Sequence, residues 1–345
     1  MTFNRRSLLA AGTLSALSLA VPLLGAQPRP ERTKVTIAVD GQSALHHLPL
    51  TLAAQLGFFK AERLEVEIID FSSSSAATQA VAVGGAQVGV GEFEQLLEGH
   101  VEGRAHQSFV LLGRARGIAL GVSPQAMPGY RQLADLKGKR IGVTAPQTAT
   151  HYLARRLLAQ AGLDDTQVSY VSLASHDLAV TAYRQGQVHA LCHADSVMTH
   201  LEQRGEIHIV ADTRTQRGSQ AVFGGAMPSA CLYAPLDFIG KHPNTTQALT
   251  HALVRSLKWL QTAGPLDLIK NVPEAFMLGD RALYLAAFNK MREVISPDGL
   301  MPDDGPATAT RALAERHQAA KLGAVATAST YTNRFAQEAK VRFKA

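Results

Sequence analysis

The stretch LHHLPLTLAAQLGFFKAERLEVEIIDF, residues 45–71, places one glycine and two phenylalanines between an apolar helical segment and a strand. The pattern predicts a helix over 47–58 that Gly57 closes, because glycine readily adopts the left-handed conformation that ends helices. Phe58 and Phe59 then pack the turn against the core. The segment 64–71 alternates apolar and polar residues, which predicts a strand.

The flanking segments extend this pattern into a βαβαβ alternation. KVTIAVD, residues 34–40, reads as a strand, and the segment 86–91 reads as another. Between the second and third strands, a helix is predicted over 75–84, closed by Gly84 and Gly85. Such an alternation favours a mostly parallel sheet with helices on both faces.

The same alternation returns in the second part of the chain. Its predicted elements are strands at 139–146, 168–173 and 187–192, and helices at 149–161 and 176–185. Two extended apolar segments between the halves, 109–124 and 228–235, are candidate crossover strands. Two lobes joined by two strands form a hinge with a cleft between them, and open α/β sheets bind ligands at the carboxyl ends of their strands.

The domain organisation follows from those crossovers. Residues 34–118 and 233–345 are predicted to form lobe 1, and residues 119–232 to form lobe 2. Helices are expected at 243–263 and 280–295, and the segment from about 300 to 345 reads only as helices that pack on lobe 1.

The N-terminal residues 1–26 have the pattern of a cleaved secretory signal. Arg5 and Arg6 precede an apolar run that ends in small residues, and 27–33 follows as a polar linker. Both Sec export and twin-arginine export fit this segment. A membrane anchor is disfavoured because the apolar run is short for a span and contains Pro22. The expected location is the periplasm.

Charge and cysteine content exclude other classes. The net charge is +6, but the basic residues are scattered, so no nucleic-acid partner is expected. The two cysteines, Cys192 and Cys231, rule out a disulfide framework. Two free buried thiols are the favoured interpretation, although an exported protein would permit one bridge between them.

Several segments together resemble one family of transport proteins. They are LPLTLAAQLGFFKAERLEVEII, AVAVGGAQVGVG, LADLKGKRIGVTAPQTAT, YRQGQVHAL and FIGKHPNTTQALTHALVRSLKWL, within residues 34–262. The chain resembles the periplasmic substrate-binding proteins of ABC importers in the SsuA/THI5-like (NMT1-like) group, which includes sulfonate, taurine, nitrate and thiamine-precursor binders. Where family members have Gly-Leu after the Gly-Phe-Phe turn, this chain has Glu62-Arg63-Leu64.

The resemblance implies an α/β, two-lobed periplasmic-binding-protein type II fold, with two doubly wound sheets joined by two crossover strands. It implies a monomer without cofactor that captures a small organic ligand, a sulfonate, taurine or carboxylate, and delivers it to an ABC permease and ATPase complex at the inner membrane. A small aromatic molecule or a thiamine-precursor pyrimidine is the alternative ligand. The sequence does not distinguish an importer component from a sensor that uses the same two lobes.

The resemblance also implies where the ligand binds, at the loop after the first strand and at helix N-termini that face the cleft. Such helix ends offer free N–H groups to an anion. The corresponding residues are Gln42, Ser43, His46, Ser73, Ser74, Ser75, Glu92, Arg116, Gln147, Thr148, Thr150, His193 and Asp195.

Each of these residues also has a structural interpretation. Serine and threonine cap helices without any ligand, Arg116 fits a partner carboxylate at the hinge, and His46 fits a surface or capping position. Glu92 and Asp195 would repel an anion unless they are protonated or paired. Either the ligand also carries an amino or hydroxyl group, or these two side chains face elsewhere.

Metal binding and catalysis are disfavoured. His46 and His47 are adjacent, and the other clustered histidines, His189, His193 and His200, straddle a strand end where side chains alternate, so no metal site is expected. The same fold includes a thiamine-pyrimidine synthase with a cysteine-rich iron motif and a desulfinase with a cysteine after its first strand. Here that loop, GQSALHH, has no thiol, so an enzyme such as a desulfinase-like lyase is not favoured.

Overall fold

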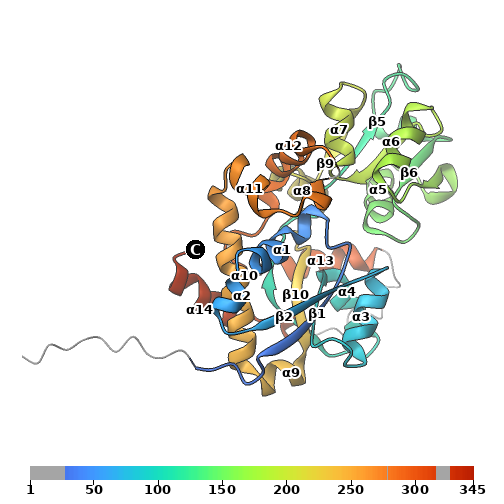
Figure 1. Cartoon of the computed structure of the whole chain (residues 1–345). Helices are drawn as coiled ribbons and strands as arrows, with labels where there is room; N and C mark the ends of the chain where they lie inside the picture. The colour runs from blue at the N-terminus through green and yellow to red at the C-terminus, as the bar shows by residue number, and fades with distance from the viewer. Residues whose placement is uncertain (1–27, 278, 316–326) are drawn as a thin grey trace, which may run out of the picture.

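The computed structural model describes residues 28–277, 279–315 and 327–345, so the predicted signal segment lies outside the described residues. The chain forms two lobes, each built on a five-stranded sheet with helices around it (Figure 1). This confirms the predicted two-lobed α/β fold. The exact residues at which the lobes divide stay a prediction, and "lobe 1" and "lobe 2" here mean the first and second sheet with the helices packed on them.

The sheet of lobe 1 has the strand order β2-β1-β3-β10-β4. Its strands are β2 (Glu65–Phe71), β1 (Lys34–Asp40), β3 (Val88–Glu92), β10 (Ala230–Pro235) and β4 (His106–Leu111). β1 pairs in parallel with β2 and β3, whereas β10 is antiparallel to both β3 and β4. The segment expected as the second crossover therefore enters the middle of this sheet.

The sheet of lobe 2 has the order β7-β6-β8-β5-β9. Its strands are β7 (Ser169–Ser172), β6 (Arg140–Val143), β8 (Ala190–Ala194), β5 (Ile118–Val122) and β9 (His208–Asp212). β5 is antiparallel to β8 and β9, so both sheets are mixed and the two crossover segments supply the antiparallel strands.

The opening stretch folds around Gly57, as predicted, but it contains two helices in place of one. α1 (Leu48–Gln55) ends before Gly57, whose φ of 69° lies in the left-handed region, and α2 (Phe58–Ala61) follows directly. Phe59 is buried in the core, while Phe58 lies under the guanidinium of Arg255, 4.3 Å from its ring centroid.

The remaining helices cover the two sheets. They are α3 (Ser74–Ala82), α4 (Phe93–Val101), α9 (Leu236–Lys241), α10 (Pro243–Thr262), α11 (Pro265–Asn271), α12 (Arg281–Met291), α13 (Gly305–Ala314) and α14 (Arg334–Phe343), and, after the first crossover, α5 (Ala149–Gln160), α6 (His176–Arg184), α7 (Val197–Gln203) and α8 (Gln216–Phe223). α10 packs on α1 and α14, and α13 packs on α4. α13 and α14, the α-helices described beyond residue 300, thus contact lobe 1.

The described part of the predicted linker is held against lobe 1. The Glu31 carboxylate accepts hydrogen bonds from the backbone N–H groups of Asn244 (2.9 Å) and Thr245 (2.8 Å) at the start of α10. These are N–H groups that a helix leaves without an internal partner. The chain therefore joins lobe 1 firmly before β1 begins. None of the helices in the described ranges is long and apolar enough to cross a membrane.

The two cysteines are free and fully buried, as predicted. Burial disfavours the charged thiolate, so it raises the pKa of both thiols, that of Cys231 to about 12. Neither thiol has the lowered pKa that an activated nucleophile needs.

Candidate functional site

A polar cavity lies where helix α4 of lobe 1 meets the start of helix α5 of lobe 2. Its volume is about 240 Å³, and the described residues that line it are Glu92, Glu94, Gln95, Glu98, Arg116, Gln147, Ala149 and Tyr152. Residues 92–98 follow β3, residues 147–152 follow β6, and Arg116 lies in the first crossover. The polar cavity is therefore built from both lobes and from the hinge, at the carboxyl ends of parallel strands.

Three of the predicted ligand residues, Glu92, Arg116 and Gln147, come together in the polar cavity. Arg116 forms an ion pair with Glu94, and their relative exposures are only 6% and 3%. This is the hinge pairing that the sequence offered as the alternative role of Arg116. A buried guanidinium next to a carboxylate has its charge largely compensated, so it attracts an anionic ligand less than a lone arginine does.

The strand ends of lobe 1 carry carboxylates. Asp40 ends β1 and Glu92 ends β3. Burial raises the pKa of Asp40, and the nearby carboxylates of Glu92 and Asp70 add to this rise. The electrostatic environment on this side of the site is therefore negative.

The start of α5 has a different character. Thr148 is its N-cap residue, but the Thr148 hydroxyl donates to the carbonyl of Ala145 (2.7 Å) and makes no cap hydrogen bond. Thr150 accepts from the backbone N–H of Thr144 (2.9 Å). Both predicted threonines thus hold the loop in shape, while α5 keeps the partial positive charge of its N-terminus beside the polar cavity.

The predicted residues after β1 and β2 lie outside the polar cavity. The backbone N–H of Gln42 donates to Asp70 (3.1 Å), and Ser43 is exposed. The Ser73 hydroxyl caps α3 by accepting from the N–H of Ala76 (3.2 Å), and Ser74 and Ser75 form the first turn of that helix. Their contacts in this structure are those of helix-capping and loop residues.

The predicted pair after β8 is buried in lobe 2. The ring of His193 hydrogen-bonds through Nε2 to the carbonyl of Leu173 (3.0 Å). The Asp195 carboxylate is fully buried and accepts from the backbone N–H and the hydroxyl of Thr199, at 2.8 and 2.9 Å. Neither side chain lines the polar cavity.

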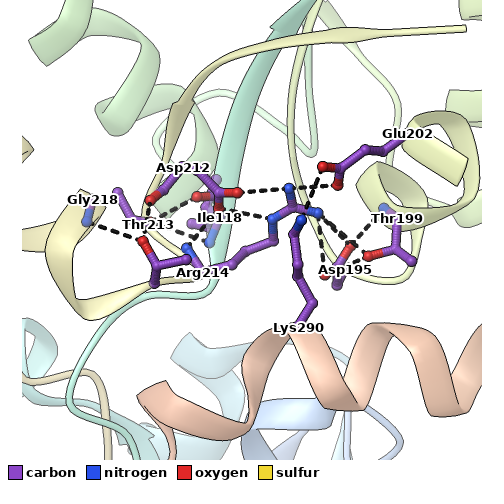
Figure 2. A network of polar contacts seen from close by, with 10 residues as sticks. Ile118, Asp195, Thr199, Glu202, Asp212, Thr213, Arg214, Gly218 and Lys290 are labelled. Atoms are coloured by element: carbon purple, nitrogen blue, oxygen red, sulfur yellow. Dashed lines mark hydrogen bonds and ion pairs between the residues drawn. The ribbon is translucent and has the colours of Figure 1, made fainter. Parts of the chain in front are cut away.

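Asp195 belongs to a charged network centred on Arg214, which Figure 2 shows. Arg214 is fully buried and contacts Asp195 (3.3 Å), Glu202 (2.9 Å) and Asp212 (2.8 Å). Lys290 of α12 bonds the other oxygen of Glu202 at 2.9 Å, so the network links α12 to α7 of lobe 2. Sequence reasoning missed this network because its members are spread over residues 195–290.

Sequence reasoning also missed Glu94, Gln95 and Glu98 as lining residues. Their signal was present, since they follow Glu92 at the end of a predicted strand and occupy the first turns of the next helix. No group of three or more His, Cys, Asp or Glu side chains able to hold a metal ion occurs within the described ranges.

The histidines after β1 predict a pH dependence of stability. Burial lowers the pKa of His46. Burial and the nearby His46 ring together lower the pKa of His47 well below its usual value near 6.5. The folded state therefore keeps both rings neutral, while the unfolded chain binds protons below about pH 6.5. Stability is full above that pH and falls as the pH decreases.

We expect the midpoint of urea unfolding to decrease between about pH 7.5 and pH 5.5, and to decrease less in His47→Gln. His208→Gln is the control, because that ring is exposed on β9. An unchanged pH dependence in His47→Gln would contradict the role of His47.

Comparisons with known proteins agree with this architecture. A family model described as NMT1/THI5 like matches residues 44–263. A solved structure from Bordetella bronchiseptica RB50 is 44% identical, with a TM-score of 0.82, and the match covers 92% of this chain and all of that one. A search of curated proteins gave no match.

More distant structures share the fold. The alkanesulfonate-binding protein SsuA from Xanthomonas axonopodis pv. citri, bound to MOPS, is 19% identical with a TM-score of 0.62, and the match covers 90% of this chain and 100% of that one. The periplasmic nitrate-binding protein NrtA from Synechocystis PCC 6803 is 12% identical with a TM-score of 0.67, over 92% of this chain and 90% of that one. Both are named as binding proteins.

Proposed function

Because the chain belongs to the NMT1/THI5-like family, we propose that it is the extracytoplasmic solute-binding component of an ABC importer. It captures a small organic ligand between its lobes and delivers it to a permease and ATPase complex. One observation carries the proposal: the polar cavity has lining residues from lobe 1, from lobe 2 and from the hinge. A ligand that contacts both lobes stabilises the arrangement in which they are close together.

The charges around the polar cavity support an acid that also carries an amino group. The N-terminus of α5 suits a sulfonate or carboxylate, whereas Glu92 and Glu98 suit a cationic amine. Within the sulfonate, taurine and carboxylate class, an amino acid or aminosulfonate such as taurine fits better than nitrate or a plain alkanesulfonate. Glu92, Arg116 and Gln147 are the predicted ligand residues that we retain.

A second candidate ligand also fits the glutamates of the polar cavity. An aminopyrimidine of the thiamine-precursor type presents N–H donors that a glutamate can accept, and Tyr152 offers an aromatic ring beside them. A desulfinase-like enzyme is not supported, because both thiols are buried and have raised pKa values.

The proposal also includes the export route of the protein and its transporter partners. The basic and apolar pattern of residues 1–26 supports export to the periplasm by the Sec or twin-arginine route. There the protein acts as a monomer and meets its permease at the inner membrane.

A thermal-shift comparison of taurine with ethanesulfonate tests the ligand class. We expect taurine to raise the melting temperature more, since a ligand at 100 times its Kd adds about 2.7 kcal/mol of stability. Glu92→Gln should weaken taurine binding by about 1.5–3 kcal/mol, because it removes a charge-assisted contact, and should spare ethanesulfonate.

Glu67→Gln is the matched control, since that exposed glutamate lies on β2 and does not line the polar cavity. Equal loss of both ligands in Glu92→Gln would contradict an amine contact. If hydroxymethylpyrimidine is the ligand that stabilises the protein, the second candidate is preferred.

A further inference from the structure

A second cavity, of about 350 Å³, adjoins the polar cavity and shares Arg116 and Tyr152 with it. The described residues that line it come from the first crossover, one face of α5, the turn after α5, the end of α8 and the end of α13; they are Arg116, Tyr152, Leu153, Arg155, Arg156, Ala159, Leu163, Asp164, Asp165, Thr166, Phe223, Ala312 and Glu315. α5 belongs to lobe 2, and α13 packs on α4 of lobe 1. The second cavity therefore continues the space between the lobes, along α5.

The inner wall of the second cavity is apolar. Leu153, Leu163, Phe223 and Ala312 are all buried and line it. The guanidinium groups of Arg156 and Arg116 lie 5.2 and 5.9 Å from the centroid of the Phe223 ring. Their aliphatic stems and the ring together form a surface that suits alkyl or aromatic groups.

The three arginines that line the second cavity are each paired with a carboxylate. Arg156 pairs with Glu315, which joins α5 to the end of α13, and Arg155 pairs with Asp165 at 2.7 Å. Arg116 pairs with Glu94 where the two cavities meet. The polar cavity therefore suits the ionic groups of a ligand, while the second cavity suits its apolar groups.

We propose that the two cavities form one elongated ligand site, in which the polar cavity holds a charged head group and the second cavity holds an apolar tail. This inference rests on the proposed binding function and narrows its ligand to amphipathic acids or amino acids with an alkyl or aryl chain. Tyr152 and Arg116, which line both cavities, sit where head and tail join.

Chain length in two ligand series tests this inference. We would measure the affinity of the purified chain by calorimetry for alkanesulfonates from ethane- to octanesulfonate, and for 2-aminoalkanoic acids from alanine to 2-aminooctanoate. Within the series whose head group binds, affinity should increase about three- to fourfold for each methylene that enters the second cavity. The head group is thereby tested separately from the tail.

Ala159→Trp fills the second cavity from an exposed position on α5, so it should not disturb folding. We expect at least about a tenfold loss of affinity for the longest ligand and no change for the shortest, because only the tail loses its contact. Thr181→Trp is the matched control: it adds the same side chain at an exposed position of α6 that lines neither cavity.

The outcomes separate the two claims. If the shortest ligands bind but affinity does not rise with chain length, the elongated site is wrong and the binding function stands. If Ala159→Trp weakens short and long ligands equally, the second cavity does not hold the tail. If no member of either series binds, the proposed ligand class fails and the elongated site fails with it.

Discussion

Arg214→Met is expected to lower the free energy of unfolding by about 3–5 kcal/mol, because it leaves the Asp195 carboxylate buried without its guanidinium. Neither side chain has any exposed surface, and Arg214 also contacts Glu202 and Asp212. Burial already raises the pKa of Asp195, while Arg214 is the main group that opposes this rise. Urea unfolding at neutral pH measures the loss.

Two further variants separate this network from an ordinary surface pair. Lys241→Met breaks the ion pair between Lys241 and Asp237, two side chains that are 69% and 73% exposed. It should lower the free energy of unfolding by less than about 1 kcal/mol. The double variant Arg214→Met/Asp195→Leu should regain part of the lost stability, because no buried carboxylate remains at position 195. A loss in Arg214→Met no larger than in Lys241→Met would contradict a buried network that stabilises lobe 2.

The second large effect is expected at the hinge, where Arg116→Leu should lower the free energy of unfolding by about 3 kcal/mol or more. The substitution leaves the Glu94 carboxylate, which is 3% exposed, without the guanidinium that compensates its charge. Arg116→Leu/Glu94→Leu should recover much of that loss, since a buried pair replaced by apolar side chains is often nearly neutral. Chemical denaturation of the wild type, both single variants and the double variant measures the coupling.

The same set of variants separates two roles of Arg116. If Arg116 contacts the ligand, the double variant recovers stability but binds taurine more weakly than Glu94→Leu does, since Glu94 itself lines the polar cavity. If Arg116 only compensates Glu94, the double variant and Glu94→Leu bind taurine equally well. Additive losses in the two single variants would show that the pair is not energetically coupled.

Much of the fold is readable from local sequence. The strands β1 and β6 contain short buried apolar runs, 37–39 and 141–143, and Gly57 has a left-handed conformation that few other residues adopt. The single helix expected over 47–58 is two helices because the chain resumes helical structure immediately after Gly57. Periodicity alone does not reveal that restart, since Phe58 and Phe59 fit both a turn and a helix.

The site was less predictable, because it depends on which residues meet across the lobes. The family resemblance implied ligand residues after the strands and at helix N-termini, and of these Glu92 and Gln147, together with Arg116 of the first crossover, line the polar cavity. The partners of Arg116 and Arg214 were not found, since choosing among the many carboxylates of the chain requires the tertiary arrangement. The second cavity was also missed, because Ala312 and Glu315 reach α5 from a C-terminal segment that the sequence identifies only as helical.

The position of β10 has a consequence for the order in which the chain folds. All strands of the second sheet come from one continuous stretch, Ile118–Asp212, so that sheet can form as soon as this stretch has been synthesised. β3 and β4 lie on either side of β10, which follows that entire stretch in the sequence. Completing the first sheet thus requires contacts of high sequence separation, which form slowly. During synthesis, the strand edges that β3 and β4 present to β10 stay unpaired until β10 emerges, so we expect the segment from β1 to β4 to be the part of the nascent chain most prone to aggregation.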